Sequence, residues 1–386
     1  MNRGGAGPAR GSRWFGTLLA VAAGLAGGAP ASASDPEPAP EAAEEGAPAD
    51  DPEARERRWS ILPLPTLGSS PETGFYGGAV ALVTARPWDS ARQSSLEVEG
   101  TLTAERQRVL TTDLRLFTPG DRVLVQVDLA AMRFPEDWWG VGPDTPASAR
   151  EGYDADRLEL ALEPLVRPAA SFFVGPSVQV QRMGRVRPAP GGLLASGSVP
   201  GASGGTSSGA GLAAVWEGRA VPVTPAAGEA YGALRTLGFG RATGSDFAFS
   251  RTELDLRAYL GLGPGLFALQ GFAQLHGGRP PFRMLGLLGG DSLQRGFYQG
   301  RYRDRQLLAG QAEVRMPVWW RLGLVAFGSL GAVSPSLSGF RGAPLRGSGG
   351  GGLRIRVDDD EGTSLRMDLA VAQGSLAFYV SFGEAF

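Results

Sequence analysis

The sequence predicts an all-β protein, a 16-stranded antiparallel transmembrane β-barrel, and three observations indicate this fold class. An export signal opens the chain, segment after segment alternates apolar with charged residues, and no later apolar run reaches the ~20 residues of a membrane helix. In lipid every backbone N–H and C=O must be paired within the protein. Strands that contact lipid must therefore close into a barrel.

Residues 1–33 predict a secretory signal peptide. Three arginines precede the apolar run Trp14–Gly28, and Ala31-Ser32-Ala33 then matches the A-x-A pattern of a cleavage site. A membrane-anchoring helix is the alternative, but the run is too short to span a bilayer. Residues 34–58 are dense in Pro, Ala, Glu and Asp and predict a disordered acidic linker, because they contain too few large apolar residues to offset the entropy of ordering.

From residue 59 to residue 386 the sequence predicts the barrel, because apolar and charged residues alternate with a period of two. In the segment 156–164 (DRLELALEP) leucines occupy one face and Arg157, Glu159 and Glu163 the other. Strands of soluble sheets also alternate apolar with polar residues. Two features favour the membrane: the polar faces carry charges of both signs, as in a wet lumen, and the opposite faces are apolar in strand after strand.

The predicted strands are 59–67, 74–85, 94–105, 107–118, 121–133, 151–165, 170–182, 208–219, 229–241, 246–261, 264–277, 305–317, 320–333, 347–357, 363–373 and 376–386. Long and short connections tend to alternate, as in bacterial barrels with long outer loops and short periplasmic turns. The long ones are Pro135–Glu151, Gly184–Ser207, Gly278–Asp304 and Ser334–Ser348. We expect Trp138-Trp139 and Trp319-Trp320, at strand ends, to lie in the interfacial aromatic girdles.

Composition excludes several functions. The net charge of −2 shows no basic surplus for nucleic acid, and the absence of cysteine excludes disulfides and thiolate metal sites. We expect no metal, no cofactor and no catalytic residue. An outer-membrane hydrolase is the alternative, but such sites generally need a histidine, and the single one, His276, has no accompanying G-x-S-x-G motif. We expect His276 to be an interfacial or loop residue.

One segment suggests a family. Between the eleventh and twelfth strands, the chain places Arg295, Gly296 and Phe297 after the glycine-rich approach of Gly289 and Gly290. The strand AEVRMPV follows. This segment resembles the BamA/TamA family of outer-membrane assembly and translocation barrels, also known as bacterial surface antigen proteins. The resemblance extends from residue 59 to residue 386, and the chain looks like a short member that lacks POTRA domains.

The resemblance implies that the loop between strands 11 and 12 folds inward and that its arginine pairs with acids on the lumen wall. Glu313 is the first candidate partner of Arg295 and Asp368 the second. Phe297 would then contact the wall. The family usually carries an aspartate where this chain has Ser329, so either Glu313 alone holds Arg295 or the loop is held less firmly.

The end of the chain also resembles the family. Its terminal-strand signal, which the barrel assembly machinery recognises during biogenesis, corresponds to Phe378, Val380, Phe382, Gly383 and Phe386. The first strand contains Pro63 and Pro65, which cannot donate ladder hydrogen bonds. A weakly paired seam between the first and last strands is one interpretation, and a ragged strand start is the other.

These features predict a non-enzymatic barrel of the Gram-negative cell outer membrane that contacts lipid. By resemblance it assists protein or lipid insertion or translocation there. Because the short linker cannot form a POTRA domain, a separate periplasmic protein would have to recruit clients. The alternative is a passive pore or a structural barrel without a client.

Overall fold

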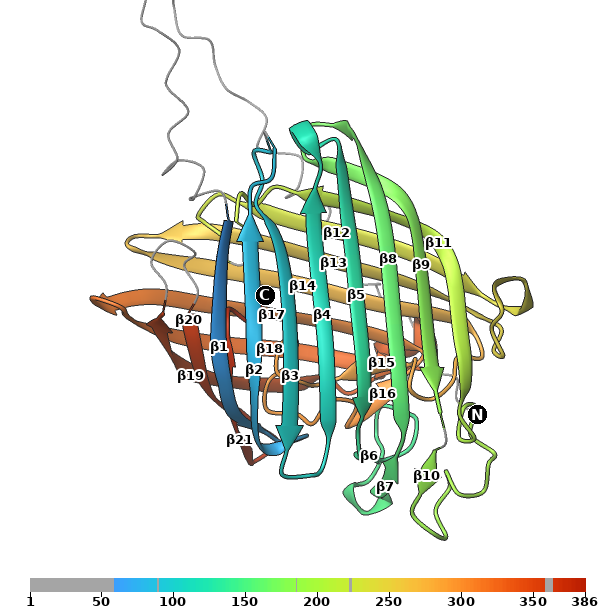
Figure 1. Cartoon of the computed structure of the whole chain (residues 1–386). Coiled ribbons are helices and arrows are strands. Elements are labelled where there is room, and N and C mark those ends of the chain that lie inside the picture. Colours follow the sequence, from blue (N-terminus) through green and yellow to red (C-terminus); the bar gives the residue numbers. More distant parts are fainter. Residues whose placement is uncertain (1–58, 89, 185, 222–223, 358–363) are drawn as a thin grey trace, which may run out of the picture. The chain divides into compact units, whose positions relative to one another are not determined.

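The computed structural model describes residues 59–88, 90–184, 186–221, 224–357 and 364–386 (Figure 1). The predicted signal peptide, 1–33, and linker, 34–58, lie outside the described residues.

Sixteen strands form one antiparallel sheet in chain order, which confirms the predicted all-β barrel. They are β1 (Trp59–Ser70), β2 (Gly74–Ala85), β3 (Ser94–Thr103), β4 (Arg108–Phe117), β5 (Val123–Arg133), β8 (Asp156–Ala169), β9 (Phe172–Met183), β11 (Gly205–Glu217), β12 (Ala230–Phe239), β13 (Phe249–Leu262), β14 (Gly265–Gly278), β17 (Gln306–Trp319), β18 (Leu322–Ser334), β19 (Arg346–Arg356), β20 (Ser364–Ala372) and β21 (Ser375–Phe382). In Figure 1 the near strands cross the far ones, as tilted barrel strands do.

The remaining elements are short. A three-stranded sheet joins β6 (Glu136–Trp138), β7 (Glu151–Asp154) and β10 (Arg187–Pro188), and a two-stranded one joins β15 (Gly286–Leu288) and β16 (Tyr302–Asp304). The helical elements of the described residues are the 3₁₀ turns Pro119–Asp121, Ala147–Ala149, Arg241–Thr243 and Ser338–Arg341. Among these residues, no helix is both long and apolar enough to cross a membrane.

One predicted strand, 151–165, is wrong in its first part. The chain leaves one sheet and enters another at Ala155, so that 151–154 forms β7 and only the part from Asp156 belongs to the barrel. Tyr153 and Ala155 are buried with Trp138 and Phe282 in a cluster formed by loops. Burial of these apolar groups therefore places β7 with the loops.

The four predicted long connections all lie at one end of the barrel, because each follows an odd-numbered strand of the antiparallel sheet. In the structure they span 134–155, 184–204, 279–305 and 335–345. We call this the long-loop end. The opposite, short-turn end has two-residue connections at 170–171, 263–264 and 320–321.

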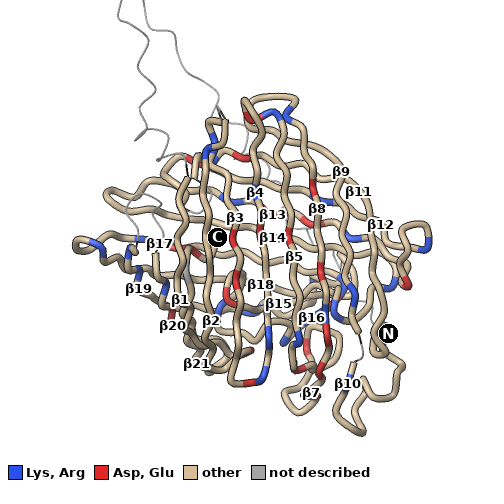
Figure 2. Tube along the Cα trace, viewed as in Figure 1, with Lys and Arg blue, Asp and Glu red and all other residues tan. Residues whose placement is uncertain are grey.

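The two faces of the strands differ as predicted. Large apolar side chains exposed on the outer face include Leu158, Leu162, Leu256, Leu369 and Val371. Charged side chains buried at alternate positions of the same strands include Arg157, Glu163, Asp255, Arg366 and Asp368. Figure 2 shows charged residues recurring along the strands as well as in the loops. An apolar outer face and a charged inner face suit a barrel in lipid.

The two tryptophan pairs differ in position. Trp319 and Trp320 are 73% and 79% exposed at the short-turn end, as girdle residues would be. Trp138 and Trp139 are buried at the long-loop end, so the girdle prediction is wrong for them. Trp138 contacts Phe282, and Trp139 contacts Tyr298, edge to face. Loop 279–305 supplies both partners, which is a tertiary contact that strand position does not indicate.

Candidate functional site

The first part of the site is loop 279–305, which contacts the inner wall through Phe297. This side chain is buried in a cluster that includes Leu288 and Tyr302 of the loop and Val333 and Ala372 of the wall. Strands β15 and β16 pair antiparallel within the loop, from Gly286 opposite Asp304 to Leu288 opposite Tyr302. The loop is thus held by its own ladder and by an apolar contact with the barrel.

Gly296 allows the loop to approach the wall. Its φ of 106° lies in the left-handed region, which side chains rarely adopt. A Cβ on Gly296 would lie 2.9 Å from the Cβ of Ala372 in β20. Its N–H donates to the hydroxyl of Tyr379 in β21 at 2.9 Å. Only glycine meets both the conformational and the steric requirement here.

Arg295 forms ion pairs with both candidate carboxylates. Its Nη2 donates to Glu313 of β17 and its Nη1 to Asp368 of β20. The side chains of all three residues have no solvent exposure. The guanidinium also lies over the ring of Phe327, with Cζ 3.6 Å from the centroid. The loop arginine is therefore held by two strands that are far apart in sequence.

The ion pairs continue into a network. Arg315 Nε donates to the second oxygen of Glu313 at 2.8 Å, and Arg354 Nη1 donates to the second oxygen of Asp368 at 2.7 Å. Arg354 Nε also donates to Glu384 at 2.8 Å. Glu313 is shared by two arginines, and Asp368 by three, because Arg366 Nε also lies 3.7 Å from its Oδ2. Such pairing offsets the cost of removing the charges from water.

Ser329, at the position of the family's acid, forms its side-chain hydrogen bond with a residue other than Arg295. It is buried and its hydroxyl lies 2.7 Å from that of Ser348 in β19. Because Asp368 supplies a second carboxylate, the expectation that Glu313 alone holds Arg295 is wrong. The missing acid is replaced by one from a different strand.

The chain does not end in a strand, so the predicted terminal strand is too long. β21 stops at Phe382, and Gly383 follows with a φ of 76° and donates its N–H to the carbonyl of Ser364. Phe386 is buried with Tyr259 and Ala268 on the inner wall, and its carbonyl accepts from Arg315 Nη2 at 3.1 Å. The left-handed glycine turns the last residues inward.

The other residues of the predicted terminal signal belong to β21. Phe378 is exposed on the outer face, and Val380 is partly buried. Tyr379, Arg354 and Glu384 were not predicted as site residues. The alternation does place Tyr379 and Arg354 on the inner face, but it does not indicate which inner residues meet the loop.

The second part of the site is the seam between β1 and β21, the two edges of the sheet. Among the described residues, no backbone ladder joins these strands. The hydroxyl of Tyr76 in β2 donates to the carbonyl of Val380, and a Cβ on Gly68 would lie 2.5 Å from that same oxygen. Gly68 thus lies opposite Val380. Since β21 ends two residues later, the first half of β1 extends beyond it.

Pro63 and Pro65 lie in that unpartnered half. Pairing of β1 with β2 continues through both, opposite Ala81 and Ala79, with no register shift. Their missing N–H groups lie on one edge of the strand, because the residues are two apart. Since the ladder with β2 is continuous, we place that edge toward the seam, where prolines are tolerated in edge strands.

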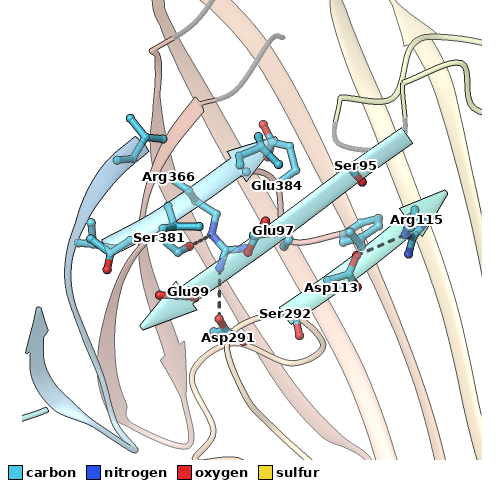
Figure 3. Close-up of a pocket in the computed structure, with 18 of the residues that line it drawn as sticks. Ser95, Glu97, Glu99, Asp113, Arg115, Asp291, Ser292, Arg366, Ser381 and Glu384 are labelled. Atoms are coloured by element: carbon cyan, nitrogen blue, oxygen red, sulfur yellow. Dashed lines mark hydrogen bonds and ion pairs between the residues drawn. The ribbon is translucent and has the colours of Figure 1, made fainter. Parts of the chain in front are cut away.

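A cavity of about 410 Å³ opens on the seam (Figure 3). Figure 3 shows Arg366 of β20 extending between Ser381 and Asp291, with Glu97, Glu99 and Asp113 on the facing strands. Arg366 Nε donates to Ser381 Oγ at 2.8 Å, and its Nη2 lies 3.6 Å from Asp291 Oδ2. A charged, water-accessible space therefore lies beside the unladdered edge.

Two other predicted features can be placed. His276 is buried near the end of β14, with Nδ1 2.7 Å from the carbonyl of Arg305, so it is not a loop residue; its interfacial position stays a prediction. Among the described residues, no three acidic or histidine side chains are placed to hold a metal ion.

Comparisons with known proteins give structural matches alone. No family model and no curated protein matches the sequence. BamA from Haemophilus ducreyi lacking POTRA domains 1–3 has a TM-score of 0.52 at 14% identity over 84% of this chain and 70% of that one. CdiB from Acinetobacter baumannii (10% identity) and CdiB from Escherichia coli (12%) also give TM-scores of 0.52 over 84% of this chain.

This chain covers 59% of the length of the Acinetobacter CdiB and 67% of that of the Escherichia CdiB. At such low identity the likeness establishes the fold and leaves the activity open. The chain has the fold of a BamA-like outer-membrane barrel.

Proposed function

We propose that the protein assists the insertion or translocation of proteins or lipids at the outer membrane, acting through the seam between β1 and β21. The observation that carries this proposal is the missing backbone ladder at the seam. Opening any other strand pair breaks a row of hydrogen bonds, each costly to leave unmade in lipid. Opening the β1–β21 pair breaks few backbone hydrogen bonds. The seam is the place where the barrel separates most easily.

The surroundings of the seam support the same role. The charged cavity gives a polar segment a hydrated path beside the opening, while the apolar outer face contacts outer-membrane lipid. Loop 279–305, held by Arg295, fixes β17 and β20 relative to each other while the seam strands move. A separate periplasmic protein recruits the client. The protein's own insertion uses the barrel assembly machinery, after export and cleavage of the signal peptide.

A cysteine pair tests the proposal directly, because the chain has no native cysteine. Thr66→Cys with Ser381→Cys places a thiol on each side of the seam cavity, in β1 and β21, at two positions that both face inward. The native gene is depleted while the variant is expressed under oxidising or reducing conditions, and outer-membrane proteins and lipid asymmetry are profiled. We expect the oxidised variant to lose specific barrels or lipid asymmetry and the reduced variant to retain them.

The matched control places the thiols across a laddered pair, with Leu269→Cys in β14 and Ala312→Cys in β17, which are register partners. This disulfide leaves the seam free, so the control is expected to behave as the wild type in both conditions. If the locked seam supports a normal outer membrane, the proposal fails.

A passive pore is the second candidate. It is favoured by a second cavity of about 740 Å³ whose lining includes charged side chains of the inner wall. Loop 279–305 obstructs the lumen beside it. Planar-bilayer recordings separate the two functions: steady, large conductance that is unchanged when the loop is shortened supports the pore, with an unchanged outer-membrane profile on depletion.

A further inference from the structure

A groove of about 580 Å³ lies on the outer face of β3, β4, β5 and β8, near the long-loop end. These four strands are neighbours in the sheet and lie side by side on the near side of the barrel in Figure 1. Two rows of register partners line the groove. The row nearer the loops is Leu102, Arg108, Arg133 and Asp156, and the next row is Gly100, Leu110, Ala131 and Leu158. A charged row therefore borders an apolar one.

Both rows face outward. Leu102, Leu110 and Leu158 are 64%, 52% and 55% exposed on the apolar outer face. Each charged residue of the first row is two positions away from a member of the apolar row, and alternate residues of a strand share a face. The groove therefore opens toward lipid, and its arginines are accessible from there.

Small residues make the apolar row concave. A Cβ built on Gly100 would have no atom within 4 Å, and the register partner of Gly100 is the exposed Leu110. Ala131 lies between Leu110 and Leu158 in the same row. These two small residues leave gaps between the exposed leucines. An acyl chain can fill such gaps, because the outer face of a barrel contacts lipid tails.

The two arginines of the groove lie directly opposite each other. Arg108 and Arg133 are register partners, which brings their Cβ atoms to about 4.5–5.5 Å and makes their charges repel. Arg133 donates to Asp154 Oδ2 at 2.8 Å, but Arg187 donates to the same oxygen at 2.8 Å. Among the described residues, the side chain of Arg108 has no hydrogen-bond or ion-pair partner, and it is exposed. Its guanidinium is therefore available to a ligand.

The surroundings of the groove carry an excess of positive charge. Arg182 of β9 continues the apolar row and is exposed, and no ion pair involves it in the part of the chain that the structure describes. Arg187 Nη2 lies 2.8 Å from Asp154 and 3.7 Å from Asp156, so it is shared between both. Four arginines thus face two aspartates, and the adjacent turn 104–107 adds one acid and one arginine. This part of the outer face therefore attracts an anion.

We propose that this groove binds a lipid with an anionic phosphate headgroup, with the phosphate on Arg108 and Arg133 and an acyl chain over Gly100 and Ala131. Adjacent guanidinium groups offer charge-assisted donors to phosphate oxygens, and the bound charge removes their mutual repulsion. The order of the rows matches such a lipid, because the arginines lie on the loop side, where headgroups begin. The site is separate from the seam, and it stands or falls independently of the proposed function.

The test is native mass spectrometry of the purified protein, released from detergent micelles that contain phosphatidylglycerol or phosphatidylcholine with the same acyl chains. We expect the wild type to bind phosphatidylglycerol about tenfold more tightly, because its headgroup carries a net negative charge. Arg108→Gln with Arg133→Gln is expected to remove this preference and leave phosphatidylcholine binding unchanged. The matched control, Arg241→Gln with Arg341→Gln, removes two exposed arginines in turns at the same end and is expected to retain the preference.

Gly100→Leu tests the apolar half of the groove, where the added side chain has room. We expect it to weaken the binding of both lipids severalfold and to leave the preference unchanged, since it occupies the place of the acyl chain and keeps both charges. Heat-modifiability on gels checks that each variant is folded. If the double arginine variant is not, Arg108→Gln alone replaces it, because this side chain has no partner to lose, and it is expected to lower the preference about threefold.

The proposal is overturned if the wild type binds the two lipids equally, or if the control loses as much preference as the groove variant. A protein dimer that the groove variant disrupts, in the absence of any lipid preference, would assign this surface to a second copy of the chain and would also overturn it.

Discussion

Arg295 shows how one residue can join distant parts of a barrel. A guanidinium without solvent exposure must be paired, and its two branches reach carboxylates on β17 and β20. Because each carboxylate also pairs with an arginine of the wall, removing either one takes a buried partner away from Arg295 and from a wall arginine at the same time. Breaking the contact between Arg295 and the wall is therefore expected to lower the stability of the folded barrel.

Removing one of these carboxylates tests that cost. Glu313→Gln and Asp368→Asn are each expected to lower the free energy of unfolding by about 3 kcal/mol, the lower end for breaking a buried ion pair. The measurement is urea unfolding in detergent, followed by gel mobility. Asp144→Asn is the control, because Asp144 is an exposed carboxylate that also pairs with an arginine. A loss in the control equal to that in the variants contradicts the prediction.

Gly296→Ala tests the close approach of the loop to β20. The added Cβ meets Ala372 and the backbone must leave its left-handed conformation, at an expected cost of about 1–3 kcal/mol. We expect faster trypsin cleavage in loop 279–305. Gly374→Ala isolates the steric part, since Gly374 has a φ of 80° but no atom within 4 Å of its Cβ position. Equal cleavage of the two variants would mean that the steric contact contributes nothing.

At the scale of elements, the C-terminal segment has two structural roles. β21 pairs with β20 along its whole length, and the three residues after Gly383 then enter the barrel interior. Glu384 pairs there with Arg354, and Phe386 fills an apolar site. The aromatic terminus therefore stabilises the folded barrel itself.

Phe386→Ala is accordingly expected to lower the free energy of unfolding by about 3 kcal/mol, as large-to-small changes at buried aromatic positions do. Phe378→Ala, on the exposed outer face, is expected to have a much smaller effect. Refolding from urea into detergent without any assembly factor measures stability alone. Equal stability of the two variants would show that Phe386 acts only as a recognition signal.

The elements of the long-loop end depend on the charge of Glu136. Burial raises the pKa of Glu136, but Arg283 and Arg157 lower it further, so that the pKa lies below its ordinary value. Because the folded pKa is depressed, the stabilisation is present above the unfolded pKa of about 4.3 and is lost as the pH falls through the folded value.

We therefore expect hydrogen exchange in segment 134–155 to be constant from neutral pH to about pH 5, after correction for the intrinsic rate, and to accelerate below about pH 4. Glu136→Gln is expected to remove this acid-dependent step. A step of the same size in the variant would assign it to another group.

At the scale of the whole molecule, the barrel has fifteen laddered strand pairs and one pair of neighbouring edges without a ladder, as far as the described residues go. Pro63 and Pro65, the shortness of β21 and the inward turn at Gly383 all act at these edges. They keep the first half of β1 from gaining a second partner. The weak pairing between β1 and β21 therefore depends on several positions along both strands.

Hydrogen exchange measures this weakness. Peptides from the first half of β1 are expected to exchange within seconds in detergent, because one edge of the strand has no ladder. Peptides from β14, which has a ladder on both sides, are expected to stay protected for hours. Equal protection of β1 and β14 would contradict an open seam.

Much of the fold could be predicted because the pattern that forms a barrel strand involves residues close together in the sequence. Alternation with a period of two and turn residues place each strand within a few residues, and an even strand number follows from closure. Strand 151–165 was misplaced, because burial of Tyr153 with loop residues separates β7 from the barrel. The site was predicted less completely, since Tyr379, Arg354 and Glu384 meet Arg295 and its partners only after the sheet closes.

The sequence by itself determined that the chain forms a 16-stranded barrel with apolar residues outside and charges inside, because both properties depend on neighbours along the chain. Only the tertiary structure decided that Asp368 joins Glu313 on Arg295 and that Phe386 turns inward. Those contacts join residues separated by several strands. Their positions depend on the tilt and closure of the whole barrel, which no local pattern specifies.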